Sequence, residues 1–179
     1  MGNTCVMSFP LRDSPEIPDS PASPVGRRFP TVTGTALSGE SVRFPDDLFG
    51  APSVLLVAYQ RMAQVDVSSW LEFLAMREPE LTVYEVPTIS AVADRRRAGW
   101  IDNGMRKGVP RVLWPQVVTL YGEGVPVHRF LGDDGFAGAS VVLLDSGGVV
   151  RWFDGRGFTV DKGGDLLDEL RQLDEAPQS

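Results

Sequence analysis

The chain has 179 residues, of which 42% are hydrophobic, and this suits one domain with a real core plus a tail. Its formal net charge of -7 disfavours nucleic acid as the main partner, because phosphate binding needs a basic surface. A single cysteine and a single histidine exclude an internal disulfide framework and a cysteine-based zinc site, so no metal and no cofactor are expected. No apolar run approaches the roughly 20 residues of a membrane-spanning helix, and no transmembrane segment is predicted.

Residues 1–28 are rich in proline among serines and acids and show no apolar periodicity. Proline removes backbone donors and resists regular structure, so this segment is predicted to be a disordered or extended leader. It lacks the basic flank and the apolar stretch of a secretory signal, which favours a cytoplasmic location.

Regular structure is expected from Phe29 onward. Residues 31–33 and 41–44, joined by a turn, fit a small β-hairpin that Pro45 ends. Residues 54–59 read Val-Leu-Leu-Val-Ala-Tyr without polar alternation, which is typical of a strand covered on both faces.

A βαβ unit follows from the next two segments. Val67, Trp70, Leu71 and Leu74 form one apolar stripe on a helix predicted over 64–76. A second strand is predicted over 81–86 and is expected to stop at Pro87. Two strands joined by such a crossover are parallel.

The rest of the chain adds five predicted elements. Ser90 is expected to cap a helix running to about residue 103, and residues 116–121 form a third strand. Residues 127–131 fit either a short helix or a strand. A hairpin is predicted over 141–153 around Ser146-Gly147-Gly148, and a leucine stripe predicts a C-terminal helix.

This element order predicts an α/β protein with the thioredoxin-like three-layer fold. It has a mixed central sheet, an N-terminal hairpin and an inserted extra strand. The domain is expected to span 29–174, with residues 175–179 as a frayed tail.

Several short motifs resemble two related groups of proteins. The first hairpin resembles that of peroxiredoxin-like proteins, in Phe29-Pro30, Thr33-Gly34, Leu37-Ser38-Gly39 and Phe44-Pro45-Asp46-Asp47-Leu48. More specific motifs resemble the mitochondrial ATP synthase assembly-factor family known as ATP-ten. They are Ala58-Tyr59-Gln60 with Ala63-Gln64, Ser69-Trp70, Tyr84-Glu85-Val86-Pro87, Gly104-Met105-Arg106 with Val109-Pro110, and Leu143-Leu144-Asp145 with Gly148 and Val150-Arg151-Trp152.

The resemblance implies a cysteine-poor thioredoxin-like protein that gives chaperone-like help in assembling the membrane sector of the synthase. It also implies an organellar location as the alternative to a cytoplasmic one. Two departures stand out. The leader is not a basic amphipathic targeting sequence. The thioredoxin class also places a proline before its terminal hairpin, where this chain has Gly138-Ala139-Ser140.

Redox chemistry is missing at the place where the fold would hold it. Thioredoxin-like proteins carry a reactive cysteine between a strand and the helix after it, where the helix N-terminus stabilises a thiolate. Residues 60–66 contain no cysteine, and Cys5 lies in the leader. The favoured function is therefore a non-catalytic binding, chaperone or assembly protein. The alternative is a peroxiredoxin-like thiol antioxidant enzyme that uses Cys5 or a partner thiol, although a leader offers no environment that activates a thiol.

The candidate binding residues are Gln60, Arg61, Gln64, Arg106 and Arg151; none is proposed as catalytic or metal-binding. The first three follow a strand whose carboxyl end is where sites gather in parallel sheets. Arg106 stands on a glycine-flanked loop that is expected to approach them, and Arg151 neighbours Trp152 on a strand. The expected occupant is a protein or a small ligand, and the sequence leaves a homodimer open.

Overall fold

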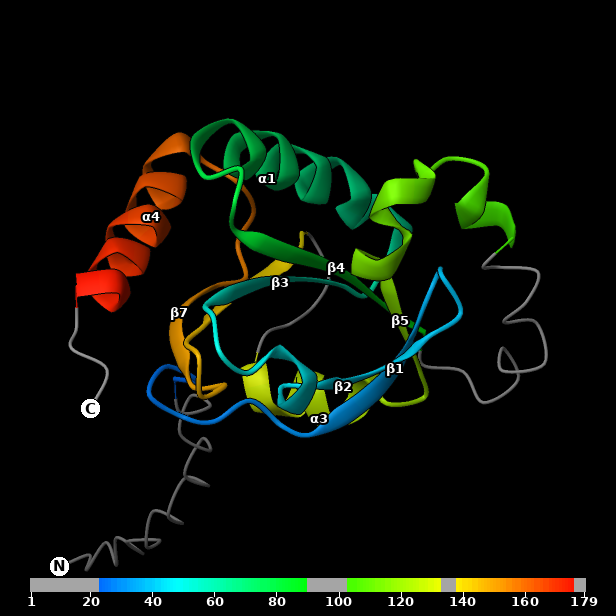
Figure 1. The fold of residues 1–179 in the computed structure, drawn as a ribbon, viewed down its shortest axis with the longest axis horizontal. Helices are drawn as coiled ribbons and strands as arrows, with labels where there is room; N and C mark the ends of the chain where they lie inside the picture. Colours follow the sequence, from blue (N-terminus) through cyan, green and yellow to red (C-terminus); the bar gives the residue numbers. More distant parts are fainter. Residues whose placement is uncertain (1–22, 90–102, 133–137, 176–179) are drawn as a thin grey trace, which may run out of the picture.

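The computed structural model describes residues 23–89, 103–132 and 138–175 (Figure 1). The strands are β1 (Val32–Ala36), β2 (Ser41–Phe44), β3 (Ser53–Ala58), β4 (Thr82–Ile89), β5 (Val118–Tyr121), β6 (Ser140–Leu144) and β7 (Val150–Asp154). The helices are α1 (Gln64–Arg77), α3 (Gly124–Leu131) and α4 (Val160–Glu175), with 3-10 turns η1 (Asp46–Leu48), η2 (Arg61–Ala63) and η4 (Arg111–Gln116). Within these ranges no helix is both long enough and apolar enough to cross a membrane.

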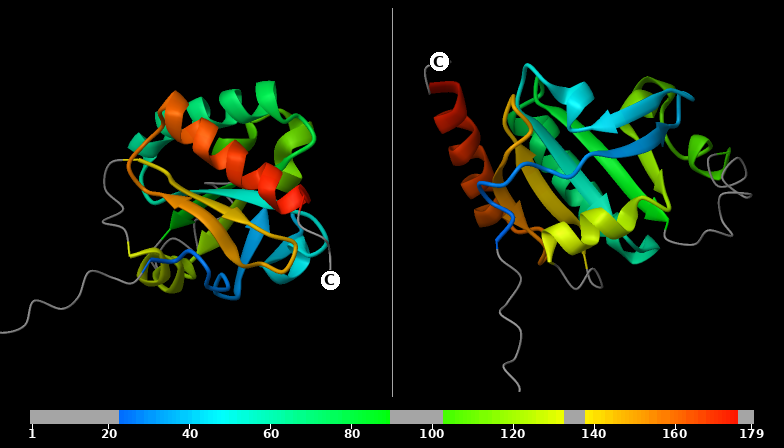
Figure 2. Two further views of the ribbon diagram at one scale, coloured as in Figure 1. Left: turned by 90° about the vertical axis from the view of Figure 1, so that its left-hand side faces the viewer. Right: turned by 90° about the horizontal axis from the view of Figure 1, so that it is seen from below.

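The seven strands described form one mixed sheet in the order β2-β1-β5-β4-β3-β6-β7. β3, β4 and β5 are parallel to one another, whereas the remaining pairs are antiparallel. α1 and α4 cover one face of the sheet, and α3 lies across the other (Figures 1 and 2). The predicted α/β class, with three layers, a mixed sheet, an N-terminal hairpin and an inserted strand, is confirmed.

β3 is the centre of the core because both of its faces are covered. Val54 and Leu56 pack with α1 and α4, whereas Leu55 and Val57 pack on the side of α3, and all four are fully buried. This explains the absence of polar alternation in the strand.

The predicted stripe of α1 faces the sheet. Val67, Trp70 and Leu74 are fully buried, and the Trp70 ring meets the rings of Trp152 and Phe158 edge-on at centroid distances of 5.8 and 5.1 Å. Trp70 therefore joins α1 to β7 and to the segment that leads into α4.

The prediction that Pro87 ends its strand is wrong. β4 continues to Ile89, and Pro87 pairs with Ala58 inside the sheet. Proline removes a backbone donor, but the Thr88 hydroxyl donates to the Ala58 carbonyl at 3.0 Å and supplies a donor at this position. The strand is prolonged because Thr88 and Ile89 also pair with β5.

The inserted region consists of β5 and α3. Residues 127–131, which the sequence left open between helix and strand, belong to α3. Val127 and Leu131 pack into the core one turn apart, and Gly132, with φ +64°, ends the helix in a left-handed conformation. The helix expected over 90–103 lies outside the described residues except for its last position.

Part of the expected leader is joined to the sheet. The Gly26 N–H donates to the Val150 carbonyl at 2.8 Å, and the Val150 N–H donates to Arg27 at 2.9 Å. These bonds attach the described end of residues 1–28 to β7, while residues 1–22 lie outside the described part of the chain, as do residues 176–179.

Candidate functional site

The loop that leads from β3 into α1, residues 60–64, is here called the corner loop. Ala63 is 2% exposed and packs in the core beside α1, and its N–H donates to the Gln60 carbonyl at 3.1 Å. Because the small apolar residue is drawn inward, Gln60 and Arg61 are left exposed and Met62 is 78% exposed.

The first turn of α1 carries a carboxylate, Asp66. Asp66 Oδ2 accepts a hydrogen bond from the Ala139 N–H at 2.8 Å, and its Oδ1 accepts one from the Phe158 N–H at 2.5 Å. Ala139 directly precedes β6, and Phe158 lies between β7 and α4. A single side chain thus connects three segments, and the negative charge lies at the end of the helix that favours it.

Two glycines allow these segments to approach Asp66. A Cβ at Gly138 would lie 2.9 Å from Asp66 Oδ2 and 3.3 Å from Gly157 Cα. Gly157 itself has φ +86°, which side-chain-bearing residues rarely adopt. The Gly138-Ala139-Ser140 sequence, which replaces the expected proline, therefore serves the Asp66 contact.

A half-buried carboxyl group lies beneath the corner loop. Glu85 of β4 is paired with Leu56 of β3, so its side chain points to the same face as α1. Burial raises the pKa of Glu85 above its ordinary value, and a hydrogen bond with the side chain of Gln64 opposes this rise. Gln64, which is exposed like Gln60 and Arg61, is therefore tied to β4 by this hydrogen bond.

Arg106 is held at the turn between β1 and β2. Its Nε donates to the Leu37 carbonyl at 2.8 Å, its Nη1 donates to Asn103 at 3.1 Å, and its guanidinium lies 5.5 Å from the Trp114 ring centroid. β1 is three positions from β3 in the sheet, roughly 14 Å at the usual strand spacing. Among the described residues, these contacts of Arg106 do not join it to the corner loop, and the grouping of the two stays a prediction.

Arg151 lies at the other end of the sheet. Its Nε donates to Asp145 Oδ2 at 2.8 Å, and Asp145 follows Leu144, which pairs with Ser53 at the start of β3. Burial alone would raise the pKa of Asp145, but hydrogen bonds from the Val149 and Gly147 N–H groups and from Arg151 lower it below its ordinary value. Arg151 therefore stabilises the β6–β7 hairpin and is not part of the corner loop site.

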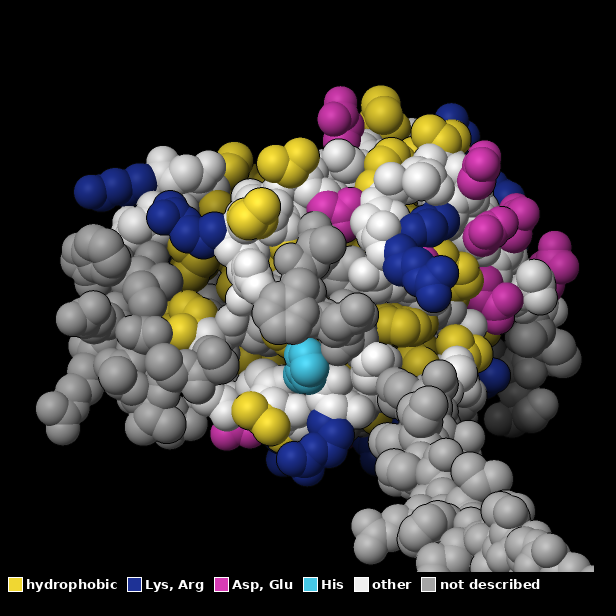
Figure 3. All heavy atoms as spheres, turned by 180° about the vertical axis from the view of Figure 1, so that it is seen from behind, with side chains coloured by type: hydrophobic (Ala, Val, Ile, Leu, Met, Phe, Trp, Pro, Cys, Tyr) yellow, Lys and Arg dark blue, Asp and Glu magenta, His cyan; other side chains and the backbone are white. Residues whose placement is uncertain are grey.

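Charge is unevenly distributed over the molecule. On the face seen from behind, acidic side chains gather on the side where α4 lies, and basic side chains lie beside them there as well as elsewhere on this face (Figure 3). A negatively charged partner would consequently be repelled from the α4 side.

Sequence reasoning missed Asp66 and Glu85 as the groups that organise this corner. An acidic residue in the first turn of a helix was a signal for Asp66. Glu85 stood between the apolar residues Val83 and Val86 of a predicted strand, which was a weaker signal. Among the described residues, no group of three or more histidine, cysteine or acidic side chains could hold a metal ion.

Comparisons with known proteins support the fold. No protein family matches the chain by its sequence profile, and no curated protein matches it either. Solved structures do match. Yeast Sco1 has a TM-score of 0.58 at 14% identity and covers 84% of this chain and 97% of its own. The thioredoxin domain of a thiol-disulfide oxidoreductase from Bacteroides vulgatus has a TM-score of 0.55 at 20% identity, covering 81% and 96%. A thiol peroxidase from Chromobacterium violaceum has a TM-score of 0.52 at 12% identity, covering 85% and 88%.

These structures share the arrangement of the sheet and its helices with this chain at low identity, so the likeness extends to the fold alone. It does not reach the assembly-factor family that the sequence motifs resemble. The chain has the thioredoxin-like fold.

Proposed function

We propose that this protein is a non-catalytic thioredoxin-like binding protein with a chaperone-like or assembly role. The observation that carries the proposal is the arrangement at the N-terminus of α1. The first turn of α1, near the helix N-terminus that would stabilise a thiolate, carries Asp66, whose two oxygens both accept hydrogen bonds from backbone N–H groups. A negative carboxylate disfavours a thiolate beside it, and residues 60–66 contain no cysteine.

The surface of the corner loop supports protein binding. Met62 and Val65, the residue that follows this loop, are each 78% exposed, and Arg61, which precedes Met62, is also exposed. Exposed apolar side chains next to an arginine are a common composition of protein interfaces. The similarity of its motifs to the ATP-ten family supports a membrane-protein subunit as the client.

Reduction of insulin in dithiothreitol tests binding and redox activity in one experiment. A disulfide reductase accelerates the precipitation of the insulin B chain, whereas a chaperone-like protein delays it. We expect a delay with the wild type, and a loss of that delay in Arg61→Ala and Met62→Asp. Arg171→Ala on α4 is the matched control, because this arginine is exposed and pairs only with a neighbour on its own helix among the described residues.

Two further measurements address the thiol alternative, which rests on Cys5. The variant Cys5→Ser should delay precipitation as well as the wild type does, and neither protein should reduce hydroperoxides. Faster precipitation of insulin, or peroxidase activity that disappears in Cys5→Ser, would overturn the proposal. Full delay in both corner loop variants would move the binding surface elsewhere.

A further inference from the structure

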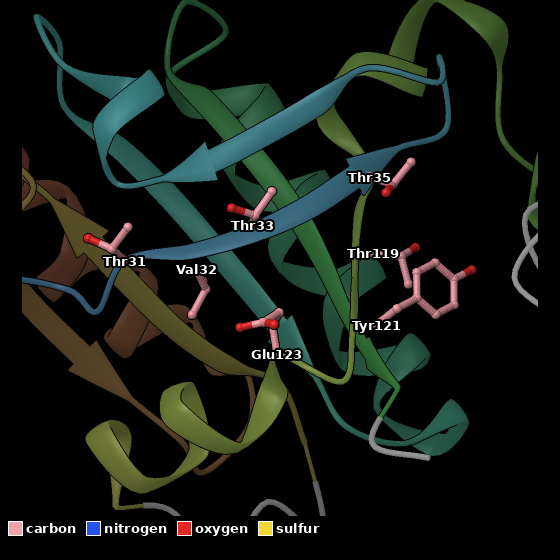
Figure 4. Close-up of a pocket in the computed structure, with 7 residues that line it drawn as sticks. All are labelled: Thr31, Val32, Thr33, Thr35, Thr119, Tyr121 and Glu123. Atoms are coloured by element: carbon pink, nitrogen blue, oxygen red, sulfur yellow. The ribbon is translucent and has the colours of Figure 1, made fainter. Parts of the chain in front are cut away.

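A polar pocket lies where β1 and β5 separate, away from the corner loop (Figure 4). The two strands pair antiparallel at Thr35 with Thr119 and at Ala36 with Val118. If the same register continued, Thr33 would lie opposite Tyr121 and Thr31 opposite Glu123, but the pairing ends at Thr35. The strands diverge from there and border an open pocket of about 440 Å³.

The vertex of this wedge is set by a glycine. A Cβ at Gly34 would lie 2.5 Å from Val118 Cγ1 and 3.0 Å from the Thr119 carbonyl oxygen. The two strands therefore stay close together as far as Gly34, and the pocket lies beyond this close approach.

The described lining is rich in hydroxyl groups. Thr31, Thr33 and Thr35 alternate along β1 with buried residues and are exposed on one face. Thr119 and Tyr121 contribute two more hydroxyls from β5. Each hydroxyl can both donate and accept a hydrogen bond, which suits a ligand whose own groups do the same.

One of these hydroxyls lacks a partner. Thr119 is fully buried, and its Oγ1 makes no hydrogen bond within the described part of the chain. A buried polar atom without a partner costs free energy, so a ligand that supplies one gains affinity from this atom.

We propose that this pocket binds a neutral polyhydroxylated ligand of about monosaccharide size. Its volume falls in the usual range of about 300–1,000 Å³ for small-molecule sites. Glu123 contributes a carboxylate, and the described lining contains no cationic side chain, which disfavours phosphate and carboxylate ligands. This site is independent of the proposed partner-binding function of the corner loop.

Ligand-observed NMR on the full chain tests the proposal with free monosaccharides and myo-inositol as probes. Their methyl glycosides and short oligosaccharides distinguish a free sugar from the end of a glycan. We expect saturable binding at about 1 mM or tighter for at least one probe. Inorganic phosphate and an unstructured peptide of alternating glycine and serine should not bind.

Two variants remove single hydroxyls from the pocket. Thr33→Val alters an exposed position and Thr119→Val removes the unpartnered oxygen, and each should weaken binding at least about fivefold. Ser53→Ala is the matched control, because it removes another buried oxygen without a described partner, far from the pocket on β3. It should bind as the wild type does. Absence of saturable binding by every polyol, binding that both threonine variants retain, or binding of the peptide or phosphate instead would each overturn the proposal.

Discussion

Replacing Asp66 with alanine should destabilise the whole domain, although the residue lies in the first turn of a helix at the surface. The side chain is half-buried and accepts two backbone hydrogen bonds, from Ala139 and from Phe158. Alanine would leave both N–H groups without an acceptor and would remove a negative charge from the N-terminus of α1.

The magnitude follows from these contacts. A hydrogen bond to a charged group contributes about 1.5–3 kcal/mol when buried. Because Asp66 is partly exposed, each of its two hydrogen bonds is expected to contribute at the lower end of this range. The favourable interaction with the helix dipole adds roughly 0.3–1 kcal/mol. The expected loss is therefore about 3–4 kcal/mol in the free energy of unfolding, equivalent to a fall of about 6–16 °C in Tm for a protein of this size. Asp66→Asn keeps one acceptor oxygen and should show an intermediate loss.

Urea denaturation followed by tryptophan fluorescence measures this effect, because Trp70 packs against Phe158 in the segment that Asp66 holds. Asp161→Ala is the matched control. Asp161 also lies in the first turn of a helix, α4, but it is exposed and accepts no hydrogen bond from the described residues. If Asp66→Ala lost no more stability than Asp161→Ala, the reasoning that Asp66 joins three segments would be refuted.

Three further predictions concern stability. Burial raises the pKa of Glu85, so the stability that its protonated form contributes is complete below its unfolded pKa and is lost as the pH rises through the folded value. Glu85→Gln should therefore stabilise the protein at pH 7 and not at acidic pH. Equal stabilities of the variant and the wild type at pH 7 would contradict this. The pKa of Asp145 is lowered, so the stability that its ionised form contributes is present above its unfolded pKa and is lost as the pH falls through the folded value. Asp145→Asn should therefore destabilise the protein by about 1–2 kcal/mol at pH 7. The difference in stability between the variant and the wild type should shrink on acid titration. Gly163→Ala should destabilise the protein by about 1–3 kcal/mol, because the new Cβ would lie 2.5 Å from Phe73 Cε1. Gly164→Ala should stabilise α4 by about 0.5–1 kcal/mol, because a Cβ there meets nothing within 4 Å. Thermal denaturation compares the two variants, and a stabilised Gly163→Ala would show that the Phe73 ring moves freely.

Part of the site could be predicted because it depends on local pattern. The apolar run of β3 and the stripe of α1 place residues 60–64 at the carboxyl end of a strand, and the structure has them there. The Ser146-Gly147-Gly148 turn likewise defines the β6–β7 hairpin. Such features arise from residues a few positions apart, and side-chain periodicity and turn chemistry are sufficient to reveal them.

By itself, then, the sequence determined the element types, the βαβ unit and the absence of a thiol in the corner loop. Only the tertiary structure decided that Asp66 joins three segments, because its partners lie 73 and 92 residues further along the chain. It also carried β4 through Pro87 and separated β1 from β5 beyond Thr35. Contacts of this kind are selected by the free energy of burying and pairing distant segments, which no local pattern of residues contains.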